Sequence, residues 1–452
     1  MKKLIISCVA LLLLASCSQS FDADLLVDSP KEDKASFSMN PYYVDYETAL
    51  QEAINFMSAD NKTRAINRTF KVKNHYEFDA TRRTRTIYTD SVDVLFHVIN
   101  FENNAGFALV SADCRTTPIY AYSDSGYINL DDVVENTGFS EFMNGAITRY
   151  LSEVSNPDVG MLAKMRIRDF PIVDTTGMVT EIINGFPYLV DSHFETIESQ
   201  DALLTTCWGQ GDPYNYYCPI REINGTDTVR CLAGCVPIAI SQILSKYRNP
   251  HTLYHYFNTS ISYPLHWTLM MQNQLFPAGT RTIGALDVAR LAVETGYRAA
   301  VHYGYDASWT TTADMTYVFN TLHYECSNLV SFDDSLARVS LGNEYPIFIA
   351  ACLSGSTDGH AWVIDGFNRI QEIKSYYHTI YPFLLVMEVP TENVITYYHC
   401  NWGWDGDANG YYLDTFSVNA PCVSNSVLNF NTNVQMIHSI YKKTNIGPQF
   451  PL

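Results

Sequence analysis

The chain has 452 residues, of which 47% are hydrophobic and 17% are charged, and its formal net charge is −19. This length and apolar content are enough for two or three folded domains and exclude a globally disordered chain. The acidic balance, without any cluster of Lys or Arg, argues against nucleic acid as a partner, because phosphate binding needs local positive charge.

The first residues predict export. Two lysines precede an apolar run from Leu4 to Leu14, which is too short to span a bilayer and is typical of a secretory signal. The run ends in Leu14-Ala15-Ser16-Cys17, a sequence that resembles a bacterial lipobox. The alternative is ordinary signal cleavage beside an incidental cysteine.

A lipobox implies a signal peptide over residues 1–16, followed by a lipidated N-terminus and tether over residues 17–42. We therefore expect a lipoprotein of the bacterial cell envelope, at the outer membrane or the cell surface. The lipid on Cys17 would be its contact with the membrane. Release of the mature domain from that anchor is a further expectation.

The cysteine content gives little support for a metal site. Of eleven cysteines, Cys8 lies in the signal and Cys17 is assigned to lipid, and the odd remainder fits at least one free thiol. No pair of C-x-x-C units and no H-E-x-x-H occurs. We expect neither a metal nor a cofactor.

The next elements predict a small α+β unit. Apolar residues at helical spacing predict a helix over Tyr46–Met57, and strand-like runs follow over 92–98, 106–111 and 119–122. Residues 139–154 return to helical spacing. We place this unit at residues 43–165. The stretch from about 156 to 206 has no strong periodicity, so the boundary with a larger region over 207–452 is placed within it.

A buried helix near the start of the larger region carries the first chemical signal. One helical face holds Val236, Ile240, Ile243, Leu244 and Tyr247. Pro237 is tolerated only in a first turn, so the helix begins at about Cys235. A helix N-terminus and a nearby imidazolium both favour thiolate. Cys235 is therefore a candidate nucleophile, with an inert core cysteine as the ordinary alternative.

Two later strands supply partners for this thiol. Gly359 to Gly366 predicts a strand with His360 near its start, and Thr396 to Asn401 predicts a second strand that leads into a glycine-rich loop. If these strands are neighbours, the Asn401 amide would orient the His360 imidazole, and Trp402 would cover that hydrogen bond. Singly, His360 fits a structural histidine and Asn401 a turn residue; in the order Cys, His, Asn they indicate thiol acyl transfer.

An oxyanion donor is the remaining requirement. Gln210 lies in Trp208-Gly209-Gln210-Gly211-Asp212-Pro213-Tyr214-Asn215. Its side-chain amide and the backbone N–H of Cys235 would both donate to a tetrahedral intermediate. Alone, it would fit a glutamine in a surface turn.

Four motifs in this order resemble the streptopain family of papain-clan cysteine peptidases, which are secreted as zymogens. They are Trp208–Asn215, Gly234–Val236 with Gln242-Ile243, His360–Gly366 and Asn401–Trp404. Upstream, Phe107–Asp113 and Ile119–Ser123 resemble the inhibitory pro-domain of that family. The similarity covers nearly everything after about Tyr43.

The resemblance implies an α+β fold in which a papain-like catalytic domain, with a helical part and an antiparallel sheet or barrel, follows a small α+β pro-domain. The pro-domain corresponds to residues 43–165, a processing region to 166–206 and the catalytic domain to 207–452. The implied activity is endopeptidase hydrolysis through a thioester acyl-enzyme. The implied partners are protein or peptide substrates and the chain's own pro-domain, acting as an intramolecular inhibitor.

Residue roles also follow from the resemblance. Cys235 is the nucleophile and His360 the base and then the acid. Asn401 is the orienting amide, Gln210 the oxyanion donor and Trp402 the cover of the site. The backbone of Gly359 would lie beside bound substrate, and Ser308 would line the cleft.

The sequence departs from the family between His360 and Asn401, where the interval is longer than in family members. The extra stretch, 369–394, is either a hairpin that extends the sheet or a flap at the cleft edge, and it leaves substrate preference open. Cys231 and Cys400 near the predicted site raise the question of a regulatory disulfide.

Other functions remain open from sequence. Asp405 to Gly410 fits the opening of a calcium loop, but its twelfth position is Phe416 in place of a bidentate Glu, which favours an acidic hairpin loop. A Cys–His acyltransferase, or an inactive surface-binding or inhibitor lipoprotein of the same fold, are the alternatives to a peptidase.

Overall fold

A computed structural model describes eleven segments of the chain. They are residues 42–60, 70–79, 94–129, 137–155, 188–223, 225, 227–311, 315–352, 359–380, 383–416 and 434–443. They belong to one compact unit, Tyr42–Leu452. The expected signal peptide, Cys17, nearly all of the tether and the processing region before residue 188 lie outside the described residues. Within the described residues, no helix is long and apolar enough to cross a membrane.

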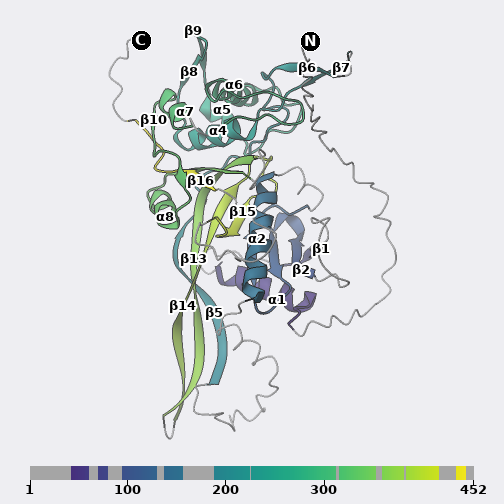
Figure 1. The fold of residues 1–452 in the computed structure, drawn as a ribbon, viewed down its shortest axis with the longest axis vertical. Coiled ribbons are helices and arrows are strands. Elements are labelled where there is room, and N and C mark those ends of the chain that lie inside the picture. Colours follow the sequence, from purple (N-terminus) through teal and green to yellow (C-terminus); the bar gives the residue numbers. More distant parts are fainter. Residues whose placement is uncertain are drawn as a thin grey trace, which may run out of the picture. The chain divides into compact units, whose positions relative to one another are not determined.

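The N-terminal unit packs two helices and four strands around one core (Figure 1). Its elements are α1 (Tyr46–Asp60), β1 (Val72–Asp79), β2 (Val94–Phe101), a 3-10 turn (Glu102–Asn104), β3 (Phe107–Ser111), β4 (Ile119–Ser123) and α2 (Thr137–Ser155). The helices and the three strands expected here are confirmed, whereas β1 was not predicted. Asp45 accepts from the backbone N–H of Thr48, which fixes the start of α1.

The C-terminal region has a helical part and a sheet part. The helical part comprises α4 (Cys235–Tyr247), α5 (Trp267–Met270), α6 (Ile283–Arg298) and α7 (Met315–Thr321), with the hairpins β6 (Ile220–Ile223)–β7 (Asp227–Arg230) and β8 (Thr252–His255)–β9 (Asn258–Pro264). The sheet part comprises β11 (Val330–Ser331), β12 (Ile347–Cys352), β13 (Gly359–Ile380), β14 (Phe383–Asn401), β15 (Gly410–Leu413) and β16 (Gln435–Ile437). Helix α8 (Asp334–Gly342) and the pair β10 (Tyr324–Glu325)–β17 (Tyr441–Lys442) complete it. This is the α+β class that the sequence predicted.

A single sheet joins the two units. Its order is β1-β2-β3-β4-β15-β14-β13-β12-β16-β11, and the junction is the antiparallel pair of β4 and β15, with Tyr411 opposite Tyr122 and Tyr412 opposite Ala121. The N-terminal unit therefore extends the sheet of the C-terminal region strand by strand. Because backbone hydrogen bonds cross the junction, the two units share one structural framework.

The two faces of this sheet belong to different cores. Alternate residues of a strand point to opposite faces. On β13, Ala361 and Val363 pack into the core of the helical part, which includes α4, whereas Trp362 and Ile364 pack into the core shared with the N-terminal unit. Over residues 361–364 of β13, successive side chains therefore alternate between the core of the helical part and the core shared with the N-terminal unit.

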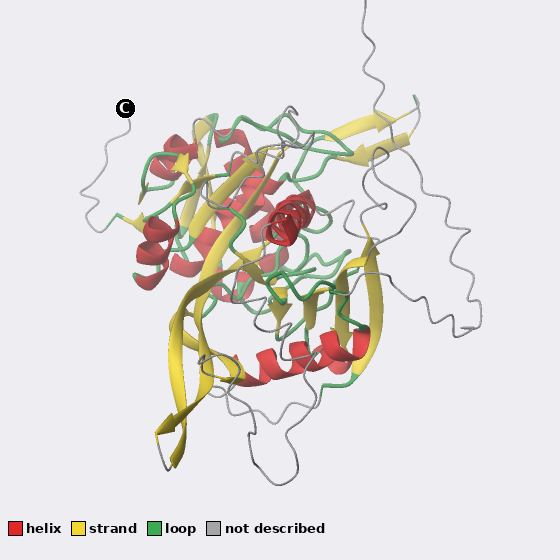
Figure 2. Ribbon diagram, turned by 60° about the horizontal axis from the view of Figure 1, so that its bottom comes forward, coloured by secondary structure: helices red, strands yellow, loops and turns green. Residues whose placement is uncertain are grey.

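The long interval between His360 and Asn401 is a hairpin. β13 and β14 pair from Val363–Asn401 to Ile380–Phe383, and Figure 2 shows them as one long curved ribbon. Of the two possibilities for the extra stretch, the structure has the hairpin that extends the sheet.

A third strand lines this ribbon. β5 (Tyr188–Gln200) pairs with β13 from Phe367–Gln200 to Tyr377–Tyr188. The prediction of irregular structure over 156–206 was therefore wrong for this segment. Residues 195–199 of β5 are all exposed, so this stretch shows no alternation of buried and exposed positions to detect.

Candidate active site

The predicted nucleophile stands at the first residue of α4. Cys235 follows Gly234, whose φ of 93° lies in a region that side chains disfavour. A Cβ at position 234 would also come within 3.3 Å of Ser308 Cβ. Both constraints call for glycine here, and they fix the turn that brings Cys235 to the helix start. The predicted helix boundary is confirmed.

The thiol of Cys235 is protonated in this form. Burial raises its pKa above the ordinary value, while the backbone N–H groups of Ala361, Val236 and Cys235 itself act in the opposite direction. The expected lowering of the thiol pKa is therefore not found, because desolvation outweighs the helix terminus. The contribution of Ala361 also shows that the sulfur lies against the start of β13, one residue from His360.

His360 is turned away from the thiol. It is buried, its ring stacks on that of Trp362 at 6.2 Å between centroids, and its Nε2–H donates to the backbone oxygen of Trp402 at 3.0 Å. Its side chain thus lies with Trp362 on the face opposite α4. The Nε2–H of the imidazole is directed at the loop after β14 and away from Cys235.

Burial also sets the charge of His360. Desolvation lowers its pKa to about 4, against the opposing influence of the Trp402 carbonyl and the negative charge of Glu141. The imidazole is neutral at pH 7. An imidazolium that would stabilise a thiolate is therefore missing from this form of the site.

Helix α2 of the N-terminal unit covers this histidine. A Cβ on Gly138 would lie 2.5 Å from Trp402 Cε3 and 2.6 Å from His360 Cδ2, so only glycine lets the helix approach so closely. Glu141, one turn further along α2, is also buried. Gly138 was not predicted as a site residue, although a glycine in the first turn of a helix is a signal of close packing.

Asn401 ends β14 beneath the site. Its Nδ2 donates to the backbone oxygen of Thr206 at 2.6 Å, and its Oδ1 accepts from Gln242 Nε2 at 3.0 Å. The amide therefore faces α4 and the segment before Trp208, whereas His360 is held by the neighbouring residue, Trp402. The orienting role of Asn401 stays a prediction.

Trp402 is fully buried between the rings of Trp362, at 5.2 Å, and Tyr412, at 5.1 Å. Its Nε1–H donates to the backbone oxygen of Ala408 at 3.0 Å. These contacts fix the indole and its carbonyl oxygen. Trp402 therefore holds the histidine through its carbonyl oxygen, and its role as the cover of the site stays a prediction.

The other predicted residues lie around the nucleophile. The backbone oxygen of Gln210 accepts from the N–H of Ala233 at 2.9 Å, which ties the oxyanion segment to the chain entering Cys235. Ser308 Oγ donates to the oxygen of Leu232 at 2.7 Å, so this residue braces that same chain. Gly359 is exposed at the first position of β13.

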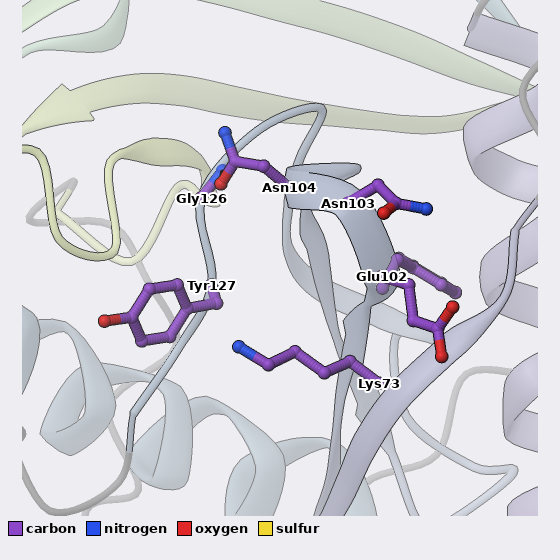
Figure 3. A pocket seen from close by; sticks show the side chains of 7 residues that line it. Lys73, Glu102, Asn103, Asn104, Gly126 and Tyr127 are labelled. Carbon is purple, nitrogen blue, oxygen red and sulfur yellow. The ribbon is translucent and has the colours of Figure 1, made fainter.

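Two hollows of the described surface lie away from Cys235. The first, of about 370 Å³, belongs to the N-terminal unit, where the Lys73 ammonium lies 4.9 Å from the centre of the Tyr127 ring (Figure 3). It is lined by Lys73, Phe101, Glu102, Asn103, Asn104, Gly126 and Tyr127. The second, of about 250 Å³, is lined by Arg149, Asp334, Arg369, Val394, Ile395, Thr396 and Asp414. Neither hollow includes a predicted site residue.

The loop from Asp405 to Gly410 connects β14 to β15. Within the described part of the chain, no group of three or more His, Cys, Asp or Glu side chains is placed to hold a metal ion.

Comparison with known proteins gives a consistent picture. Residues 208–412 match the model of the peptidase C10 family, and residues 41–146 match the model described as Spi protease inhibitor. A curated relative, the thiol protease/hemagglutinin PrtT of Porphyromonas gingivalis, is 22% identical over 380 residues. That match covers 79% of this chain, which spans 38% of the length of the relative.

Two solved structures of Prevotella intermedia proteins are also similar. The prointerpain A fragment is 19% identical, covers 83% of this chain and all of its own, and gives a TM-score of 0.48. The active interpain A cysteine protease is 22% identical, covers 54% of this chain and 95% of its own, and gives a TM-score of 0.35.

A thiol at a buried helix start, a histidine on the adjoining strand and an inhibitor-like unit over that histidine are the features of a cysteine-type peptidase with a pro-domain. The catalytic region has the papain-like division into a helical part and a sheet part. Residues 208–412 match the peptidase C10, or streptopain, family.

Proposed function

We propose that the chain is a latent, lipid-anchored cysteine endopeptidase, in which the described form is the zymogen. The observation that carries this proposal is the position of Cys235: its sulfur lies at the N-terminus of α4 and against the Ala361 amide, next to His360. A rotation of one side chain, accompanied by a shift at the start of β13, would bring the imidazole to the thiol.

The latent state follows from the contacts of His360. Its Nε2–H is held by the Trp402 oxygen, and Gly138 of α2 lies so close that there is no room for a Cβ beside its ring. With Nε2 protonated, Nδ1 carries the lone pair that a base needs. Departure of α2 would hydrate the ring, raise its pKa towards about 6.5 and free it to turn. Removal of the pro-domain would thus create the base as well as open the cleft.

The proposed reaction begins with transfer of the Cys235 proton to His360. The thiolate attacks the peptide carbonyl, and the oxyanion accepts hydrogen bonds from the Gln210 side chain and the Cys235 N–H. His360 then returns the proton to the leaving amine, which leaves a thioester on Cys235. Water, deprotonated by His360, hydrolyses the thioester and regenerates the thiol. Asn401 would hold the imidazole through this cycle.

The envelope location is proposed from the sequence alone. The run that ends in Leu14-Ala15-Ser16-Cys17 supports cleavage before Cys17 and its lipidation. We expect the wild type to partition with membranes and Cys17→Ala to lose that partition while it keeps its peptidase activity.

The nucleophile is tested by Cys235→Ala in the full-length chain. We expect peptide hydrolysis to fall by roughly 10⁴-fold or more, and self-processing to stop at the longer precursor. N-terminal sequencing of the matured wild type then gives the processing point. Cys326→Ala is the matched control, since that thiol is half-buried in the helical part. Normal maturation and turnover by Cys235→Ala would overturn the proposal.

A further inference from the structure

Gln242 lies two turns after Cys235 on α4 and is completely buried. Its side chain makes two hydrogen bonds to different parts of the site. Oε1 accepts from the backbone N–H of Trp208 at 3.2 Å, and Nε2 donates to Asn401 Oδ1 at 3.0 Å. One amide on the nucleophile helix therefore connects the oxyanion segment with the end of β14.

The orientation of both amides is determined by backbone groups at the two ends of this chain of hydrogen bonds. The Trp208 N–H can only donate, so it must face Gln242 Oε1. The oxygen of Thr206 can only accept, so it must face Asn401 Nδ2, at 2.6 Å. The middle bond then runs from Gln242 Nε2 to Asn401 Oδ1. A flip of either amide would place like atoms together.

A hydrogen bond from a serine hydroxyl group completes the network on α4. Ser245 Oγ donates to the backbone oxygen of Gln242 at 2.6 Å and lies 3.5 Å from Thr206 Oγ1. All of these side chains are buried, with exposed fractions of 0–2%. In such surroundings a satisfied network is rigid, and the loss of one member leaves its partners unpaired.

We propose that Gln242 is a positioning residue of the peptidase reaction. It sets the distance between the Gln210 oxyanion donor and the Asn401–Trp402 pair that controls His360. The inference rests on the proposed function, because Gln242 itself takes no part in the chemistry and acts only by positioning the residues that do. Gln210 follows Trp208 by two residues and is tied at its own oxygen to Ala233. The oxyanion segment is thus fixed at one end to the approach to Cys235 and at the other to Gln242.

Two substitutions of Gln242 test its two side-chain hydrogen bonds. Gln242→Met keeps the length of the side chain and removes both hydrogen bonds. Gln242→Glu keeps an acceptor for Trp208 but turns a carboxylate towards Asn401 Oδ1. Misplacement of a catalytic group by about 1 Å costs roughly 10²-fold, so we expect both variants to lose about 10- to 100-fold in kcat, with KM within about threefold of the wild type.

The pH profile distinguishes positioning from general destabilisation. In Gln242→Glu the introduced carboxyl group, once protonated, would again donate a hydrogen bond to Asn401 Oδ1. This variant should therefore recover turnover as the pH falls, whereas Gln242→Met should not. Variants are matured in trans by a trace of the wild-type enzyme and compared per titrated Cys235 thiol. Ser241→Ala is the matched control, because the buried Ser241 hydroxyl makes no hydrogen bond within the described residues; it should keep wild-type kcat.

A double substitution provides the decisive outcome. If Gln242 acts through Asn401, then Gln242→Met should add little to the loss caused by Asn401→Ala. Wild-type kcat per titrated site in Gln242→Met, or losses that simply multiply in the double variant, would overturn the inference. An inactive wild type would instead overturn the proposed function.

Discussion

At the scale of single residues, the His360 imidazole has a lower proton affinity in the latent form than a hydrated catalytic base would have. In the described form its pKa is about 4, because burial penalises the imidazolium. An exposed imidazole has a pKa of about 6.5. The two states therefore differ in proton affinity, and pH must act on the balance between them.

Acid should weaken pro-domain binding through this residue. His360 binds a proton less readily in the latent form than in the released form. The stabilisation of the latent form by neutral His360 is therefore fully present above about pH 6.5 and declines as the pH falls towards about 4. Because one proton is involved, the equilibrium constant for pro-domain binding falls by up to about tenfold per pH unit. We expect self-processing of wild-type enzyme to begin sooner at pH 5 than at pH 7, and a titration of His360 in Cys235→Ala by NMR to give a pKa well below 6.5.

Burial also lowers the pKa of His97 within the pro-domain, so a control is needed. In the Cys235→Ala background, replacement of His360 by Gln should flatten the pH dependence of pro-domain release but leave the part that comes from His97. An unchanged profile in this double variant would show that His360 is not the group responsible.

Gly138 gives a steric test of latency. A methyl group at this position meets the rings of Trp402 and His360 at 2.5–2.6 Å, and overpacking of this kind costs about 1–3 kcal/mol. We expect Gly138→Ala to loosen the pro-domain by roughly tenfold or more and to shorten the lag before self-processing. Leu151→Ala on the same helix is the control, since the Leu151 side chain is exposed. Equal lags in the two variants would contradict the assigned contact.

At the scale of elements, an aromatic cluster fastens α1 to the catalytic region. The Phe56 ring lies 5.0 Å from Tyr122, 5.7 Å from Tyr397 and 6.3 Å from Phe194. These partners come from β4, β14 and β5, so one side chain contacts both units. Tyr122 is further held by Asn368, whose Nδ2 donates to the phenol oxygen at 2.8 Å.

Phe56→Ala should therefore weaken docking without touching His360. Loss of these ring contacts costs about 2 kcal/mol, which corresponds to roughly 30-fold in the binding equilibrium. The measurement is the rate of self-processing of the full chain, together with thermal unfolding of the Cys235→Ala form. Gln51→Ala, on the exposed side of α1, should behave as the wild type. A Phe56→Ala chain that matures at the wild-type rate would contradict the fastening role.

At the scale of the whole molecule, the sequence predicted those parts of the fold that carry a local signal. Helix α4 was predicted from its apolar face and from Pro237, and β13 from the glycines around His360. By contrast, β5 was missed because it is exposed and paired at an edge. The junction of β4 with β15 has no local signal, since either strand would look the same against another partner.

The same distinction applies to the site. Cys235, His360 and Gln210 were predicted from residue type and local context. The direction of the His360 side chain was not, because it depends on α2, a helix more than two hundred positions earlier in the chain. The raised pKa of the Cys235 thiol was also missed, since desolvation depends on everything packed around the group.

The pairing of β4 with β15 has a consequence for what happens after the chain is cut. If the two fragments separated, each would expose one unpaired strand edge: β4, with Tyr122, on the N-terminal fragment and β15, with Tyr411, on the C-terminal fragment. Scission of the connecting peptide alone would leave the two pieces adhering to each other. The fragments would separate only after a second cut, or after water or another polypeptide replaces the hydrogen bonds between these strand edges. Cleavage of the chain and the onset of activity are therefore separate events in time.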